Sequence, residues 1–154
     1  MKIFNGAMFF VLSFGLAACA EDEDPEETMK SGCSQDSRVD EFSAGMEKTI
    51  GELSVTLSDF TPTPPERGGN LFDMMIRDAQ GEALEGATVT VTAAMPDHGH
   101  GSTEDAVVSE SGEPGEYHAD PVYFQMGGYW SVSVRVEAKD GFDEEVMFGF
   151  CIES

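Results

Sequence analysis

Apolar and polar residues alternate one by one along much of the chain after residue 50. The clearest run covers residues 129–136, where a tryptophan and three valines alternate with tyrosine, serine and arginine. Successive side chains of a β-strand point to opposite faces, so this pattern predicts strands with one buried and one solvated face. No stretch shows the periodicity of a long amphipathic helix.

Turn-forming residues divide this part of the chain into short strands. Proline-rich residues 61–65 end the first strand, and turns are expected at residues 78–81, 112–115 and 139–141. The predicted strands cover residues 53–57, 72–76, 87–92, 107–108, 117–124, 130–136 and 146–152. About seven strands with frequent turns predict an immunoglobulin-like antiparallel β-sandwich. Residues 33–154 have the length of one such domain.

The N-terminal residues predict export. Lys2 precedes an apolar run that ends in Leu16-Ala17-Ala18-Cys19. Roughly twelve apolar residues are too few for a membrane-spanning helix, which needs about twenty, so residues 1–18 are interpreted as a signal peptide. The final tetrapeptide resembles the bacterial lipobox, which implies cleavage before Cys19 and acylation of its thiol. The alternative is ordinary cleavage at an Ala-x-Ala-like site.

Several acyl chains on Cys19 would anchor the protein stably in a membrane. Because Ala20 rather than an aspartate follows this cysteine, the resemblance to sorted lipoproteins favours the outer membrane of a two-membrane cell, facing the periplasm. Residues 19–32 are expected to form a disordered acidic tether, since residues 21–27 hold six acids and a proline. The tether is interpreted as a solvated spacer, with a cation-binding tail as the alternative.

The overall charge limits the classes of partner. The sequence has 30 acidic residues against 8 lysines and arginines, a formal net charge of −22. Nucleic acid is excluded as a partner because its binding needs clusters of Lys and Arg, which this chain lacks. The acidity also raises the local concentration of cations, which suits a metal-handling protein without establishing one.

Two cysteines remain once Cys19 is assigned to the anchor. Cys33 and Cys151 are expected to form a disulfide in an oxidising exported compartment, joining the first segment of the domain to its last strand. The alternative is a redox couple or a pair of metal ligands, although neither cysteine belongs to a Cys-x-x-Cys motif.

The candidate metal ligands are imidazoles and thioethers. His98 and His100 lie in a glycine-rich segment that begins with Met95, and a His-x-His pair on an extended segment projects both rings to one side. Met126 precedes two glycines that suggest a tight turn near the same end of the sandwich, and His118 is a further candidate. Imidazole suits Cu(II), zinc or nickel, whereas a thioether selects Cu(I).

Each candidate has an alternative interpretation. The His98 and His100 pair is also typical of a polar surface loop. Met95 and Met126 could fill gaps in the core, because methionine is flexible and apolar. His118 could face solvent from a strand.

Three motifs together resemble the YtkA-like family, to which FixH-type proteins are related. They are Met-Pro-Asp-His-Gly-His-Gly at residues 95–101, Gly-Glu-Tyr-His-Ala at 115–119 and Phe-Gln-Met-Gly-Gly-Tyr-Trp at 124–130. The resemblance covers residues from about 78 to 148. It implies a small exported or membrane-anchored β-sandwich, often encoded with copper or cytochrome oxidase functions. Copper is thus implied by the functions encoded beside this family, and not by the spacing of the residues.

These observations favour a lipid-anchored envelope protein that binds or passes a transition metal, copper above others, through its Met and His residues. The alternative is a structural or interaction module of an envelope complex, in which the histidines are incidental. Catalysis is not expected, because the chain lacks nucleophile, phosphate-binding and zinc-protease motifs.

Overall fold

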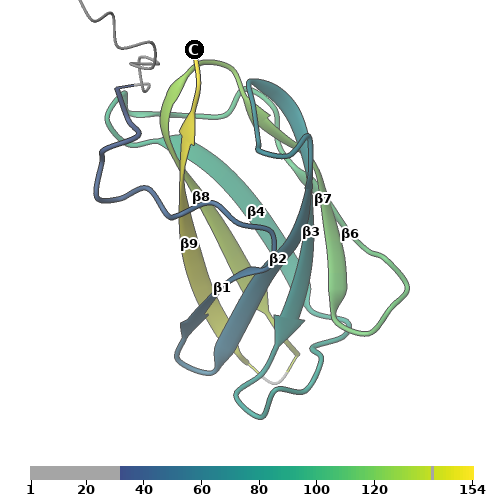
Figure 1. Cartoon of the computed structure of the whole chain (residues 1–154). Coiled ribbons are helices and arrows are strands. Elements are labelled where there is room, and N and C mark those ends of the chain that lie inside the picture. The colour runs from purple at the N-terminus through teal and green to yellow at the C-terminus, as the bar shows by residue number, and fades with distance from the viewer. Residues whose placement is uncertain (1–31, 140) are drawn as a thin grey trace, which may run out of the picture.

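The computed structural model describes residues 32–139 and 141–154, which form two antiparallel sheets packed face to face (Figure 1). The predicted signal peptide, Cys19 and almost the whole tether lie outside these residues. In the part described, no helix is long and apolar enough to cross a membrane. The five-stranded sheet contains, in spatial order, β1 (Met46–Ile50), β2 (Leu53–Thr61), β3 (Gly68–Arg77), β7 (Glu116–Phe124) and β6 (Val107–Glu110); the four-stranded sheet contains β5 (His100–Gly101), β4 (Thr88–Met95), β8 (Gly128–Glu137) and β9 (Asp143–Ile152).

The strand order confirms the immunoglobulin-like prediction. The orders β2-β3-β7-β6 and β5-β4-β8-β9 correspond to the A-B-E-D and C′-C-F-G sheets of immunoglobulin domains. The described residues form nine strands rather than about seven. The prediction missed β1, whose side chains are exposed or only half-buried, and β5, which has two residues.

The core follows from the alternation. Trp130, Val132, Val134 and Val136 are all 0% exposed, as the pattern predicts. Between the sheets lies an aromatic cluster whose ring centroids are 4.8 to 6.4 Å apart, formed by Phe60, Phe72, Phe124, Phe150 and Trp130. Aromatic rings at such separations stabilise beyond the area they bury.

The predicted disulfide is confirmed. Cys33 is bonded to Cys151, with an S–S distance of 2.07 Å and a sequence separation of 118 residues. Residues 33–42, called the strap below, then lie across the outer face of β9. Gly149 faces outward in β9 but is buried, because the strap covers it: a Cβ atom added there would lie 2.0 Å from the Arg38 carbonyl oxygen.

The antiparallel strands place the loops at two ends of the sandwich. One end, called the histidine end, carries loop 62–67, the β4–β5 turn, the β7–β8 turn, the Cys33–Cys151 disulfide and the C-terminus; it is uppermost in Figure 1. The opposite end, called the turn end, carries the connections after β1, β3, β6 and β8.

Candidate metal site

His98 and His100 lie in and beside a tight turn that joins β4 to β5. The amides of His98 and Gly99 donate to the Met95 carbonyl oxygen, at 3.1 and 3.0 Å. Gly99 has a φ of 68°, a conformation that glycine adopts without strain. Both imidazoles are exposed, and their ring centroids are 5.7 Å apart. The turn therefore holds two imidazoles side by side at the surface.

The structure places Met95 in the core and not at the surface beside the two imidazoles. Its side chain is 2% exposed, on the same inward face of β4 as Val91 and Ala93. Its Cε atom lies 2.7 Å from the position that a Cβ atom on Gly128 would occupy. Met95 thus fills the space beneath the β7–β8 turn, which is the alternative interpretation of this residue.

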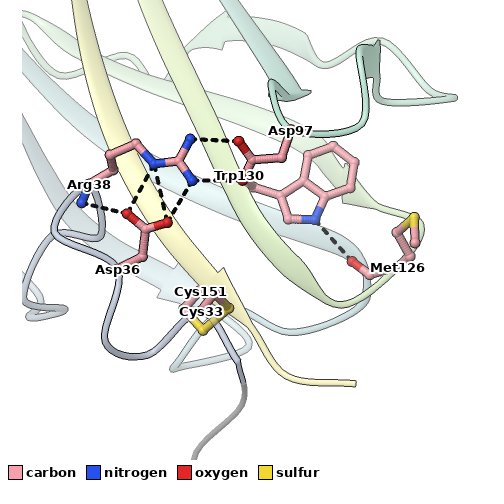
Figure 2. The surroundings of a disulfide bond; sticks show 7 residues. All are labelled: Cys33, Asp36, Arg38, Asp97, Met126, Trp130 and Cys151. Carbon is pink, nitrogen blue, oxygen red and sulfur yellow. Dashed lines mark hydrogen bonds and ion pairs between the residues drawn. A yellow bond between two sulfur atoms is a disulfide. The ribbon is translucent and has the colours of Figure 1, made fainter.

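Met126 lies at the same end as the histidines. It is partly buried against the core, in the short connection between β7 and β8. Its carbonyl oxygen accepts a hydrogen bond of 2.9 Å from Trp130 Nε1 (Figure 2). The Trp130 ring lies 6.2 Å from the His100 ring, centroid to centroid. Trp130 therefore links the turn that carries Met126 to the histidine pair.

His118 lies apart from this group. It lies on the outer face of β7 in the five-stranded sheet, where its Nδ1 contacts Asp73 Oδ1 of β3 at 2.5 Å. Its neighbours Tyr117 and Ala119 face the core, so the alternation of the strand turns His118 outward. The candidate site therefore keeps His98, His100 and Met126.

Gln125 supports His100 from the neighbouring turn. Its Nε2 donates to the Gly101 carbonyl oxygen at 2.9 Å and lies 3.2 Å from His100 Nδ1. His100 Nδ1 is also 3.1 Å from the same carbonyl oxygen. Gln125 Oε1 is buried, with no hydrogen-bond partner in the described part of the chain. Sequence reasoning missed Gln125, and its position just before Met126 was the available signal.

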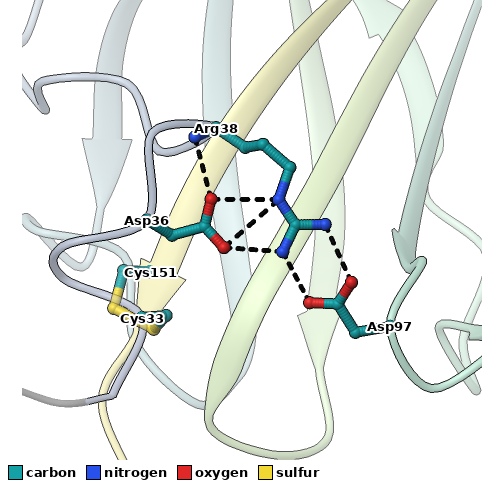
Figure 3. A network of polar contacts seen from close by, with 5 residues as sticks. All are labelled: Cys33, Asp36, Arg38, Asp97 and Cys151. Carbon is teal, nitrogen blue, oxygen red and sulfur yellow. Dashed lines mark hydrogen bonds and ion pairs between the residues drawn. A yellow bond between two sulfur atoms is a disulfide. The ribbon is translucent and has the colours of Figure 1, made fainter.

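Asp97, between Pro96 and His98, is held by an arginine of the strap. Arg38 donates from Nη1 to Asp97 Oδ1 at 2.8 Å and from Nη2 to Asp97 Oδ2 at 2.6 Å (Figure 3). The same guanidinium binds Asp36 and lies 4.1 Å from the centre of the Tyr129 ring. Hydrogen bonding to Arg38 lowers the pKa of both carboxyl groups, that of Asp36 to about 2.

This arrangement defines what the site offers chemically. Among residues 32–139 and 141–154, no cluster of three or more His, Cys, Asp or Glu side chains is placed to hold a metal ion. Both oxygens of the Asp97 carboxylate are engaged by Arg38. The donors at the histidine end are thus two exposed imidazoles, with a thioether at the same end of the sandwich. Such donors suit transition metals better than hard, oxygen-binding ions.

Comparison with known proteins gives one family match. The family described as YtkA-like matches residues 47–135, which include both histidines and Met126 but neither Cys33 nor Cys151. This range begins further upstream and ends earlier than the resemblance seen in the motifs. No curated protein matches the chain. Among solved structures, a DUF4426 family protein from Pseudomonas aeruginosa PAO1 aligns with a TM-score of 0.48 at 13% identity, over 70% of this chain and 96% of that one.

Proposed function

This chain belongs to the YtkA-like family, and we propose that it is a lipid-anchored envelope protein that binds or passes copper at its histidine end. The observation that carries the proposal is the exposed pair of imidazoles, His98 and His100, on a turn fixed by backbone hydrogen bonds and by Arg38. Such a pair would supply two of the ligands of a four-coordinate metal ion.

The spacing of the two rings suits a shared ion. Imidazole nitrogens bind such metals at about 2.0–2.1 Å, which places two rings on one ion with centroids roughly 4.5 to 6 Å apart. The observed 5.7 Å falls in this range. A metal-binding histidine commonly donates its other ring N–H to a carbonyl group, and the Gly101 carbonyl oxygen lies 3.1 Å from His100 Nδ1. His100 would then bind the metal through Nε2.

The thioether decides which metal is favoured. Imidazoles alone serve several divalent metals, whereas sulfur from Met126 favours Cu(I). A site with both donor types can hold either oxidation state of copper, and the net charge of −22 draws cations toward the protein.

The position of Cys33 bears on the anchor. The described chain begins beside Cys33 at the histidine end, and 14 residues of sequence separate Cys19 from Cys33. Under the proposal, a lipid on Cys19 would keep Cys33, which lies at the same end as the metal site, within roughly 50 Å of the membrane surface, the reach of an extended chain of that length. Incorporation of labelled fatty acid, lost in Cys19→Ser, tests the anchor.

Copper titration of the full chain in detergent tests the metal site. We expect the double variant His98→Ala/His100→Ala to bind Cu(II) at least about tenfold more weakly than the unchanged protein, because it loses both imidazole donors. Met126→Leu should weaken Cu(I) binding, measured with ascorbate as reductant, more than Cu(II) binding. His118→Ala, which removes a histidine from the other sheet, is the matched control. Equal affinities in the double variant and the control would refute the proposal.

The alternative function is an interaction module without metal. The observation that favours it is an open cleft of about 700 Å³ at the histidine end, between loop 62–68 and residues 123–125. A protein partner that co-purifies stoichiometrically, and survives both chelation and the double histidine change, would favour this function. In that case copper would not raise the melting temperature, as a specific ligand must.

A further inference from the structure

The strap makes one long-range connection that bears directly on the histidine turn. Its first residue is fixed to β9 by the Cys33–Cys151 disulfide, and Asp40 fixes it near its other end. The Asp40 amide donates to the Gly149 carbonyl oxygen at 2.9 Å, and the Gly149 amide donates to Asp40 Oδ2 at 2.7 Å. Arg38 lies between these two anchors, so its backbone is held on β9 from both sides.

The Arg38 side chain extends from the strap to the β4–β5 turn, as Figure 3 shows. It forms a two-pronged contact with Asp97, 59 residues away in sequence, while Asp36 and the Tyr129 ring hold the same guanidinium in place. Planar guanidinium and carboxylate groups that pair in this way fix orientation as well as distance. Because Asp97 directly precedes His98, this contact restrains the turn that carries the imidazole pair.

The strap, the histidine turn and the β7–β8 turn also share one small cleft. It has a volume of about 270 Å³ and is lined by residues from all three segments, among them Cys33, Asp36, Asp97 and Gly128. A displacement of the strap therefore opens space beside the histidine turn.

We propose that the strap is a disulfide-anchored clamp, and that the thiol–disulfide state of Cys33 and Cys151 controls the order of the histidine turn. This regulation rests on the proposed function only in its effect on copper; the clamp itself acts in the metal-free protein. Reduction by a dithiol transfers two electrons. A dithiol thiolate attacks one sulfur of the Cys33–Cys151 bond and releases the other cysteine as a thiolate. The second thiol of the dithiol then attacks the resulting mixed disulfide and releases the remaining cysteine, so the products are two cysteine thiols and the oxidised dithiol.

Hydrogen exchange of the His98 and Gly99 amides in the metal-free full chain tests the clamp. We expect exchange to be roughly two- to fivefold faster in Arg38→Gln, the range for loss of an exposed ion pair. It should also be faster in the unchanged protein treated with dithiol, and in Cys33→Ser/Cys151→Ser. Gly149→Ala keeps the cysteines and Arg38 but pushes the strap off β9, so it should have the same effect as Arg38→Gln.

Arg135→Gln is the matched control. Arg135 makes the same kind of two-pronged contact, with Asp143, at 2.8 and 2.6 Å on the outer face of the same sheet, but at the turn end. Arg135→Gln should therefore leave the hydrogen exchange of the His98 and Gly99 amides unchanged. Equal exchange in Arg38→Gln and the unchanged protein, or equal acceleration by Arg135→Gln, would overturn the clamp.

Copper affinity then tests the regulation separately. The histidine turn is exposed, and exposed segments have low local stability, so loss of the Arg38 contact should reduce the population of the ordered turn. The apparent affinity for copper falls in proportion to that population. We expect Arg38→Gln to bind Cu(II) about two- to fivefold more weakly than Arg135→Gln. Faster exchange with unchanged affinity would overturn the regulation. Loss of the proposed function is distinct, because it would appear as equal copper binding by the double histidine variant and the unchanged protein.

Discussion

The two ends of the sandwich are held together in different ways. At the turn end, local backbone hydrogen bonds close the connections, such as Gly81 N to Asp78 O at 2.9 Å and Ala138 N to Phe142 O at 2.9 Å, and hydrogen bonds of the Tyr117 hydroxyl add to the connection after β3. At the histidine end, contacts between residues far apart in sequence hold the loops. Cys33 and Cys151 are 118 residues apart, Arg38 and Asp97 are 59 apart, and Gln125 and Gly101 are 24 apart.

This difference has a physical consequence for function. A turn closed mainly by its own backbone hydrogen bonds is ordered once its strands pair. A loop held by distant contacts is ordered only while those contacts persist, so its geometry can respond to chemistry elsewhere in the molecule. The candidate metal site lies at the end that is built in this second way.

Removal of the disulfide should have the largest effect on stability. A crosslink that closes a loop of more than a hundred residues reduces the entropy of the unfolded chain, and loss of a native disulfide typically costs about 2–5 kcal/mol. We expect Cys33→Ser/Cys151→Ser to lower the free energy of unfolding by that amount in urea denaturation. A loss below about 1 kcal/mol would show that the strap is not anchored by this bond and would remove the main difference between the ends.

Trp130→Phe should have the next largest effect, at the histidine end. Trp130 is fully buried, and its Nε1 donates to the Met126 carbonyl oxygen. Phenylalanine would leave that carbonyl group without its donor and a cavity beside Phe124, which together should cost about 2–4 kcal/mol of unfolding free energy. Urea denaturation measures the cost, and an effect below that of Tyr117→Phe would contradict this ranking.

Tyr117→Phe is the counterpart at the turn end. The Tyr117 hydroxyl donates to the Leu84 carbonyl oxygen at 2.9 Å and accepts from the Ala87 amide at 3.3 Å. Burial raises the pKa of Tyr117, which keeps the hydroxyl protonated as a donor. Because the ring is retained, we expect a loss of about 1 kcal/mol in the same assay. Copper binding should not change, and a change would mean that the two ends are coupled.

The contrast between the ends also explains what the sequence could predict. Residues 129–136 alternate so regularly that they predict β8 and its buried face, and the glycine-containing turns mark most strand ends at the turn end. These signals are local, and local hydrogen bonds build the structure there. The strand β1 was missed because a half-buried edge strand with a central lysine, Lys48, has no clear apolar face.

The candidate site was harder to predict because distant residues build it. The histidine pair was visible in sequence, but Arg38 and Gln125 reach its turn across 59 and 24 residues. The position of Gln125 beside Met126 was a weak signal, and nothing near Arg38 indicates its contact. Met95 is different, because the local signal was present: it continues the inward face of Val91 and Ala93, which are 5% and 6% exposed. The adjacent His-x-His motif drew the interpretation toward a ligand instead.

The smallest expected effect is a pH dependence of the strap. Hydrogen bonding to Arg38 lowers the pKa of Asp36 from 3.8 to about 2, so the folded state favours the charged carboxylate more than the unfolded state does. The contribution to stability is therefore fully present above pH 3.8 and is lost as the pH falls through about 2. We expect the difference in urea midpoint between the unchanged protein and Arg38→Gln to shrink over that interval.

Asp36 is exposed, which keeps the change small, and high salt should reduce it further because ions screen exposed charges. A difference that stays constant down to pH 2 would mean that Arg38 acts through its stacking on Tyr129 rather than through its carboxylate partners.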